Sequence, residues 1–151
     1  MNLDGDPRPP YDRTVTFRFP RHPRSVPRAR DALRRCTGLT GDTAAIAALL
    51  LSELVTNALR HGSPPGRQIA VTLHRTEGLL RLEVEDAGDR LPRPRTAEPD
   101  LDDECGRGLA LVAALADDWG VAPRRGPGKC VWVSLKVSGD TGLTWGGPGL
   151  T

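Results

Sequence analysis

The sequence LLLSELVTNALRHG, residues 49–62, predicts a helix that is apolar around most of its circumference, which is typical of a buried helix. Glu53, Asn57 and His61 nevertheless recur at every fourth position, so they share one stripe of that helix. A carboxylate and an amide on a buried face are costly unless a partner or a ligand satisfies them. The stretch therefore predicts a polar cavity against the helix; the alternative is a stripe that faces solvent.

The overall composition is that of a soluble globular domain. The chain has 151 residues, enough for one domain with its own core, and is 38% hydrophobic and 26% charged. A net charge of +2 and an aromatic content of 4% argue against direct binding of nucleic acid. The sequence has no run of about 18 consecutive apolar residues, so we expect no membrane span.

The cysteines and the N-terminus indicate a cytoplasmic protein. Cys36, Cys105 and Cys130 are odd in number and lack CxxC spacing, which favours reduced thiols over disulfides or zinc ligands. The polar, proline-rich start of the chain is unlike a secretory signal. We expect disorder over residues 1–12, one domain over residues 13–137, and a flexible glycine-rich tail over residues 138–151.

The hydrophobic patterning predicts an α+β two-layer sandwich, a mostly antiparallel sheet covered on one face by helices. The expected strands are residues 14–19, 68–75, 80–86 and 129–137, and the expected helices are residues 25–36, 42–61 and 108–118. Ser25 and Asp42 are the expected helix caps. Residues 68–86 form the expected hairpin, and residues 90–105 form a long loop of the kind that is usually functional or mobile.

Asp86 ends the second strand of that hairpin. It follows the apolar residues Leu82 and Val84 at alternate positions, so its carboxylate should face the helices as they do. There it can accept a hydrogen bond from an exocyclic amine, and Gly88 lets the backbone approach a ligand. The alternative is an ordinary Asp-Ala-Gly turn. Glu83 and Glu85 have the opposite parity and are expected on a solvated face, and His74 is expected at the surface.

Two further groups of residues could bind a nucleotide. Gly106-Arg107-Gly108 stands where the third helix begins, and exposed backbone N–H groups with the helix dipole favour an anion there; a flexible helix start is the alternative. The Lys-Ser/Thr of a Walker A loop is missing. Asn57 offers a neutral oxygen suited to magnesium, and Glu53, one turn away, could polarise an attacking hydroxyl or water.

Three motifs, in this order, resemble the ATP-binding superfamily of gyrase, heat-shock chaperone, histidine-kinase and mismatch-repair ATPases (GHKL). They are ExxxNAxxHG at residues 53–62, DxG at residues 86–88 and GRGLxLV at residues 106–112. Residues 106–120 and the GKCVW segment at residues 128–132 are most similar to the anti-sigma-factor serine/threonine kinase branch. The resemblance extends over residues 14–137.

The resemblance implies a Bergerat-type, histidine-kinase-like ATPase fold that takes ATP and Mg²⁺. It implies Asn57 as the magnesium ligand, Glu53 as the general base and Asp86 as the reader of the adenine amine. The full nucleotide-binding set that it implies is Asn57, Asp86, Gly88, Gly106, Arg107, Gly108 and Leu109.

The resemblance also implies a function and partners. The expected protein is a kinase that sequesters a sigma factor and phosphorylates a serine of an anti-anti-sigma (STAS-type) protein, and members of the family often form homodimers. The alternative is a non-catalytic nucleotide-binding or protein-interaction module. A histidine-kinase fragment or a gyrase-like ATPase fits less well, because we expect neither a His-bearing helical hairpin nor a transducer domain in this sequence.

Two departures from the family pattern predict a weaker affinity for the nucleotide. Many relatives have a second glycine after the Asp-x-Gly pair, where this chain has Asp89 and Arg90. Many also place a threonine hydroxyl near the adenine, in the region where this chain has Lys129 and Cys130. Neither departure changes Glu53 or Asn57.

Overall fold

The computed structural model describes residues 13–61, 67–76, 78–86, 104–123 and 128–137, and within α3 it places the side chains from residue 110 onward. The described elements are β1 (Arg13–Pro20), α1 (Ser25–Thr37), α2 (Gly41–His61), β2 (Gln68–Arg75), β3 (Leu79–Asp86), α3 (Glu104–Leu115), β4 (Asp118–Pro123) and β5 (Lys129–Lys136). Residues 1–12, 138–151 and most of the expected loop at residues 90–105 lie outside this set.

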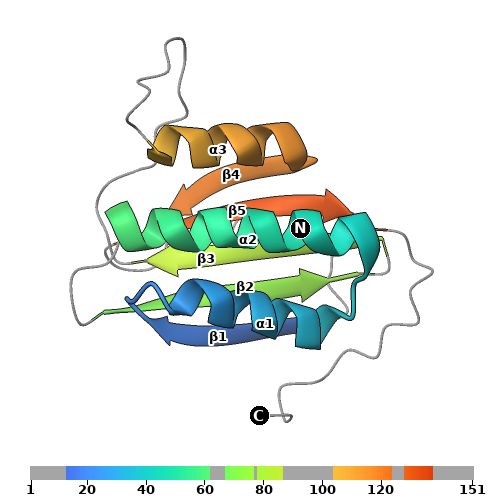
Figure 1. Cartoon of the computed structure of the whole chain (residues 1–151), viewed down its shortest axis with the longest axis horizontal. Helices are drawn as coiled ribbons and strands as arrows, with labels where there is room; N and C mark the ends of the chain where they lie inside the picture. The colour runs from blue at the N-terminus through green and yellow to red at the C-terminus, as the bar shows by residue number, and fades with distance from the viewer. Residues whose placement is uncertain (1–12, 62–66, 77, 87–103, 124–127, 138–151) are drawn as a thin grey trace.

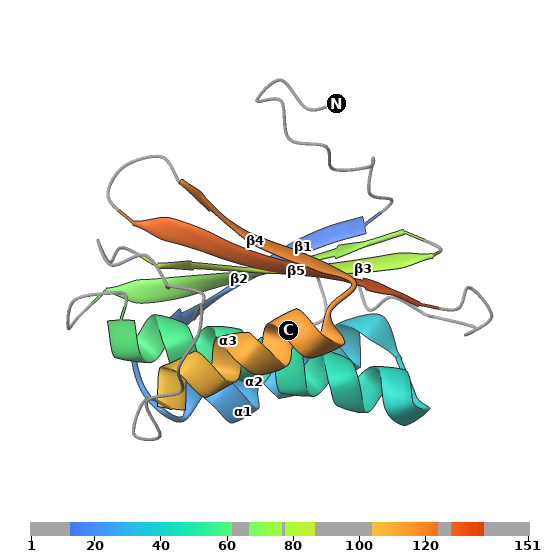
Figure 2. The ribbon, with the colours of Figure 1, turned by 90° about the horizontal axis from the view of Figure 1, so that it is seen from above.

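The strands form one antiparallel sheet in the order β1-β2-β3-β5-β4. The three helices lie over the same face of this sheet, with α2 between α1 and α3 (Figures 1 and 2). The predicted α+β two-layer sandwich is therefore confirmed. The β2–β3 hairpin has the expected register, in which Leu73 pairs with Leu82.

Helix α2 is the centre of the hydrophobic core. Its most buried side chains, each at most 1% exposed, are Ala47, Leu50, Leu51, Leu54, Val55 and Ala58. By length and composition, residues Gly41–Arg60 are apolar enough to cross a membrane, although the sequence pattern predicted no such segment. In the fold this segment packs between two helices and the sheet, which accounts for its apolar character (Figure 1).

The alternation of the strands decides which residues meet the helices. The helix-facing core residues are Ile69, Val71 and Leu73 of β2, Leu80, Leu82 and Val84 of β3, and Val131, Val133 and Leu135 of β5. Asp86 continues the β3 series and Lys129 begins the β5 series, and the two residues pair across the strands. Both therefore lie on the helix-facing side of the sheet, as predicted for Asp86.

The boundaries of the third helix were predicted wrongly, and one strand was missed. Helix α3 begins at Glu104 rather than at residue 108, and it ends at Leu115. The following residues form β4, an edge strand with the sequence DWGVAP. Gly120 and Pro123 weaken the strand signal in the sequence, but an edge position tolerates proline because one side of the strand needs no partner.

The expected capping role of Ser25 is also wrong. Its hydroxyl donates a hydrogen bond to the Pro20 carbonyl at 2.6 Å, while Arg24 occupies the N-cap without a side-chain capping bond. Ser25 therefore ties the first turn of α1 back to the end of β1. At the other end, Gly38 adopts the left-handed conformation (φ 61°) and its N–H caps the Arg34 carbonyl, as glycine commonly does after a helix.

The face of the sheet opposite the helices carries a buried polar network. Glu83 is 5% exposed and His74 is 8% exposed, so the predicted solvated face and surface histidine are both wrong. The Glu83 carboxylate accepts from Arg81 Nε at 2.8 Å and lies 3.1 Å from His74 Nε2. The guanidinium of Arg81 lies 4.2 Å from the centre of the Trp132 ring. Pairing explains the burial, since a charged group can be buried when its charge is compensated.

Candidate functional site

Four chain segments that carry the predicted site residues meet at one end of the molecule. The C-terminal end of α2, the end of β3, the start of β5 and the start of α3 all lie at the left in Figure 1. Because β3 and β5 are antiparallel neighbours, the end of β3 lies next to the start of β5. Helix α2 runs in the same direction as β3, so its C-terminal end lies at this end of the sheet as well (Figure 1). Residues that are far apart in the sequence are thus assembled around one end of the helix-facing surface.

Asn57 is the most informative residue of this site. It is 6% exposed, and neither its side-chain oxygen nor its side-chain nitrogen has a hydrogen-bond partner within the described part of the chain. An unsatisfied buried amide costs about 1–3 kcal/mol in proteins. A ligand that supplies the missing contacts removes that cost, so the amide is suited to hold a hydrated cation or a polar ligand.

Glu53 lies one helical turn before Asn57 on α2 and is half-buried. The i, i+4 spacing places both side chains on the same stripe of the helix, as the sequence predicted. Partial exposure leaves the carboxylate accessible to a hydroxyl or a water. His61 is the last residue of α2, and its side chain lies outside the described set.

Asp86 faces a lysine that is as deeply buried as the carboxylate itself. Its carboxylate oxygens lie 3.5 Å and 3.4 Å from Lys129 Nζ, and the two side chains are each 1% exposed. Lys129 and Cys130 occupy the region in which the resemblance expected a neutral hydroxyl near the base. The carboxylate of Asp86 therefore lies on the predicted side of the sheet, with an ammonium group against it, and its role as the reader of the base stays a prediction.

The predicted phosphate-binding residues are placed by their backbone alone. Gly106, Arg107, Gly108 and Leu109 form part of the first two turns of α3, whose beginning is directed to the same end of the molecule as Asn57 (Figure 1). Residue Gly88 lies outside the described residues. The roles predicted for these five residues stay predictions.

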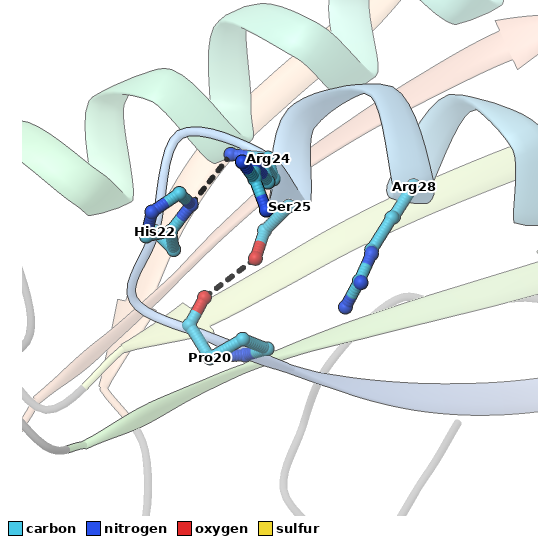
Figure 3. Close-up of a pocket in the computed structure, with 5 residues that line it drawn as sticks. All are labelled: Pro20, His22, Arg24, Ser25 and Arg28. Carbon is cyan, nitrogen blue, oxygen red and sulfur yellow. Dashed lines mark hydrogen bonds between the residues drawn. The ribbon is translucent and has the colours of Figure 1, made fainter.

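A second group of side chains lies on the side of α2 that faces α1. Pro20, His22, Arg24, Ser25 and Arg28 line a small cavity of about 170 Å³ (Figure 3). A neighbouring cavity of about 370 Å³ lies between the start of α1 and the end of α2. Its lining residues are Arg21, His22, Pro23, Val26, Thr56, Leu59 and Arg60. These basic cavities are separate from the Asp86–Lys129 pair on the other side of α2.

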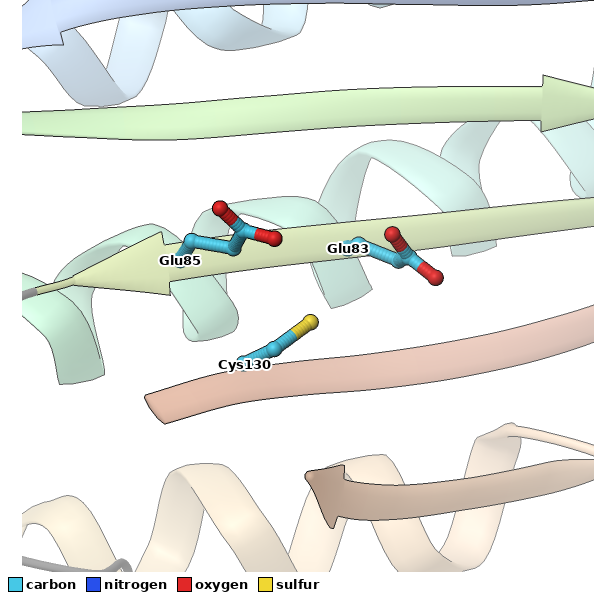
Figure 4. Close-up of side chains that lie close together, drawn as sticks. All are labelled: Glu83, Glu85 and Cys130. Atoms are coloured by element: carbon cyan, nitrogen blue, oxygen red, sulfur yellow. The ribbon is translucent and has the colours of Figure 1, made fainter. Parts of the chain in front are cut away.

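A third group has the composition of a metal site. The potential ligand atoms of Glu83, Glu85 and Cys130 lie within 4.8 Å of one another on the sheet face opposite the helices (Figure 4). Burial acts to raise the pKa of Glu83, but hydrogen bonds and charge from His74 and Arg81 lower that pKa to about 2. The Glu83 carboxylate is thus already compensated by protein groups, which weakens the case for a metal there.

Two arrangements were not predicted from the sequence. The buried Glu83 network gave no signal, because charged residues at alternate strand positions usually indicate a solvated face. The inward position of Lys129 could have been found from parity, since Lys129 precedes the helix-facing series Val131 and Val133 by the same two-residue step, but its pairing with Asp86 depends on the sheet order. Cys36 and Cys130 are buried and form no disulfide within the described residues, and Cys105 is not among the described side chains.

Comparison with known proteins identifies the domain type. A family model described as a histidine kinase-like ATPase domain matches residues 19–135, from the end of β1 almost to the end of β5. The match therefore includes α2, the Asp86–Lys129 pair and the start of α3. A comparison with curated proteins gives no match.

Proposed function

This chain belongs to the histidine kinase-like ATPase domain family, and on that premise we propose that it is an ATP-dependent serine/threonine kinase of the anti-sigma-factor type. The family assignment supports an ATP-binding regulatory domain. The observation that carries the proposal is the buried amide of Asn57, which has no hydrogen-bond partner in the described part of the chain and lies one turn after Glu53 on α2. A ligand that forms the missing hydrogen bonds would offset the cost of burying this amide.

The proposed roles of these residues are nucleotide binding and proton transfer. The Asn57 oxygen would hold Mg²⁺, which supplies neutralisation of phosphate charge when bound. Asp86 would accept a hydrogen bond from the exocyclic amine of adenine. Backbone N–H groups at the start of α3 would receive phosphate oxygens, as helix N-termini do. Glu53 would orient the attacking serine hydroxyl and accept its proton.

The anti-sigma assignment rests on the likeness of residues 106–120 and 128–132 to that branch. The proposed partners are a sigma factor, which the protein sequesters, and a STAS-type anti-anti-sigma protein, whose serine receives the phosphoryl group. We also propose that the protein acts in the cytoplasm and as a homodimer.

The second candidate function is a nucleotide-binding module without catalysis. The observation that favours it is the Lys129 ammonium against Asp86, because a charged pair at the proposed base site concerns recognition of the nucleotide and adds nothing to phosphoryl transfer. The two functions share all their binding residues, and they differ only in whether a phosphoryl group leaves ATP.

The experiment that separates them is a transfer assay. Purified protein is incubated with Mg-[γ-³²P]ATP and each of a panel of purified STAS-domain proteins, and phosphoserine is located by mass spectrometry. Multiple turnovers on one serine support the kinase. Binding of Mg-ATP with no transfer to any partner and no ATP hydrolysis supports the non-catalytic module.

A further inference from the structure

The Lys129 ammonium is buried with more hydrogen-bond donors than partners. Its side chain is 1% exposed, and within the described ranges Asp86 is the one residue that forms a hydrogen bond or ion pair with Nζ. An ammonium has three donors and no acceptor, and it is strongly hydrated in water. A single carboxylate does not replace that hydration, so at least one donor remains available to a ligand.

The geometry of the pair differs from that of a closed structural ion pair. Hydrogen bonds between an ammonium and a carboxylate are usually about 2.7–2.9 Å long. Here the two N···O distances are 3.4 Å and 3.5 Å, although both groups are sealed from solvent. A pair that served stability alone would gain by closing this gap, because burial is favourable only when the charges are well compensated.

A second buried polar group lies at the same end of the fold as the pair. Asn57 belongs to the C-terminal part of α2, and this end of the helix lies at the same end of the molecule as the end of β3 and the start of β5, which carry Asp86 and Lys129 (Figure 1). Both amide atoms of Asn57 are buried without partners in the described part of the chain. Two buried groups with unmet hydrogen bonds within the described residues therefore lie at one end of the fold, which points to a ligand with several polar atoms.

From these observations we infer that Lys129 reads the nucleotide base directly. Asp86 can only accept hydrogen bonds and Lys129 can only donate them, so together they complement a ligand edge that carries a donor beside an acceptor. The Watson–Crick edge of adenine has this pattern, with the N6 amine as donor and N1 as acceptor. Lys129 donates to N1 while Asp86 accepts from N6, and this step rests on the proposed ATP site.

The first test needs no protein variant. The affinity of the wild-type chain is measured by titration calorimetry for Mg-ATP, for 1-deaza-ATP, which lacks the N1 acceptor, and for 7-deaza-ATP, which keeps it. A hydrogen bond to a charged group predicts that 1-deaza-ATP binds at least tenfold more weakly than ATP. The analogue 7-deaza-ATP should bind within about threefold of ATP, because the proposed contacts do not involve N7.

The second test links the ligand atom to the residue. In Lys129→Gln, which keeps a donor toward Asp86 but loses the charge, the penalty for 1-deaza-ATP should fall by about threefold or more. Thr72→Ala, on the opposite face of the sheet, serves as the control and should keep the full penalty. A circular-dichroism melt confirms that each variant is folded before its affinity is compared.

The outcomes separate this inference from the proposed function. Equal binding of ATP and 1-deaza-ATP, with a Mg²⁺ requirement that Asn57→Ala abolishes, overturns the role of Lys129 and leaves the ATP site in place. Absence of any ATP binding overturns both. A penalty for 1-deaza-ATP that is unchanged in Lys129→Gln also overturns the inference, because another donor must then face N1.

Discussion

Asp86 and Lys129 stand opposite each other on β3 and β5, and their charged groups lie 3.4 Å apart in a region that solvent does not reach. We expect Lys129→Met to lower the free energy of unfolding by about 3–5 kcal/mol, because it removes the ammonium group that faces a buried carboxylate. The double variant Asp86→Asn/Lys129→Met should recover much of that loss, since no buried charge remains. Urea unfolding of wild type, Lys129→Met, Asp86→Asn and the double variant measures this coupling.

A loss below about 1 kcal/mol in Lys129→Met would contradict this account of the pair. Such a small loss is typical of solvent-exposed ion pairs, in which water replaces the missing partner.

Gly120 on β4 lies beneath the Trp132 ring of β5. A Cβ atom at this position would come within 2.8–2.9 Å of three atoms of the indole ring, which is closer than such atoms pack. We expect Gly120→Ala to lower the free energy of unfolding by about 1–3 kcal/mol through overpacking. Gly78→Ala is the matched control, because nothing lies within 4 Å of its added Cβ. Equal stability of the two variants in urea would mean that the ring moves aside freely.

The Glu83 network predicts a specific loss of stability in acid. Burial opposes ionisation of Glu83, but contacts with His74 and Arg81 hold its pKa at about 2, below the ordinary value of 4.5. A group whose pKa is lowered by folding stabilises the protein above its unfolded pKa, and this contribution disappears as the pH falls through the folded pKa. The contribution should therefore be complete above about pH 4.5 and lost between pH 4.5 and pH 2.

The measurement compares wild type with Glu83→Gln by urea unfolding across this range. The difference in unfolding free energy should be on the order of 3 kcal/mol at neutral pH and should shrink steadily below pH 4.5. A difference that stays constant down to pH 2 would show that the ionisation of Glu83 does not contribute.

Glu53 is the residue on which phosphoryl transfer should depend. We expect Glu53→Ala to reduce transfer to a STAS-domain serine by at least about 100-fold, the lower end of the usual contribution of a positioned base. Its affinity for Mg-ATP should change little, because Asn57 and Asp86 carry the proposed contacts with the nucleotide. The control is Glu85→Ala, a half-buried glutamate on the opposite side of the sheet. Transfer that survives in Glu53→Ala would rule out the assignment of the base.

The sequence was most informative where a pattern is repeated. The apolar helix around residues 49–62 and the alternating strands on either side of Gly78 predicted the two-layer fold and the inward position of Asp86. The short strand β4 escaped prediction because glycine and proline occupy two of its six positions. Its place is set by pairing with β5 rather than by local propensity.

The sequence predicted on which face the site residues lie, but it did not predict which charged residues pair with one another. The spacing of Glu53 and Asn57 on one helix placed them on a common stripe, and the structure adds that the amide of Asn57 is buried and unpartnered in the described residues. The pairing of Lys129 with Asp86, and of Glu83 with Arg81 and His74, depends on which strands are neighbours. That information lies in the sheet order β1-β2-β3-β5-β4, in which β5 lies between β3 and β4.

We propose that the amide of Asn57, which is without a partner among the described residues, binds a magnesium-bound nucleotide. Thermal unfolding of wild type and Asn57→Ala with and without Mg-ATP tests this most directly. At about 100 times its dissociation constant the ligand should add about 2.7 kcal/mol to wild type, a shift of several degrees that requires Mg²⁺. Asn57→Ala should lose this shift while its ligand-free melting temperature stays near wild type, and Thr56→Ala should keep both. A ligand-free Asn57→Ala that is strongly destabilised, or one that retains the full Mg-ATP shift, would contradict the claim.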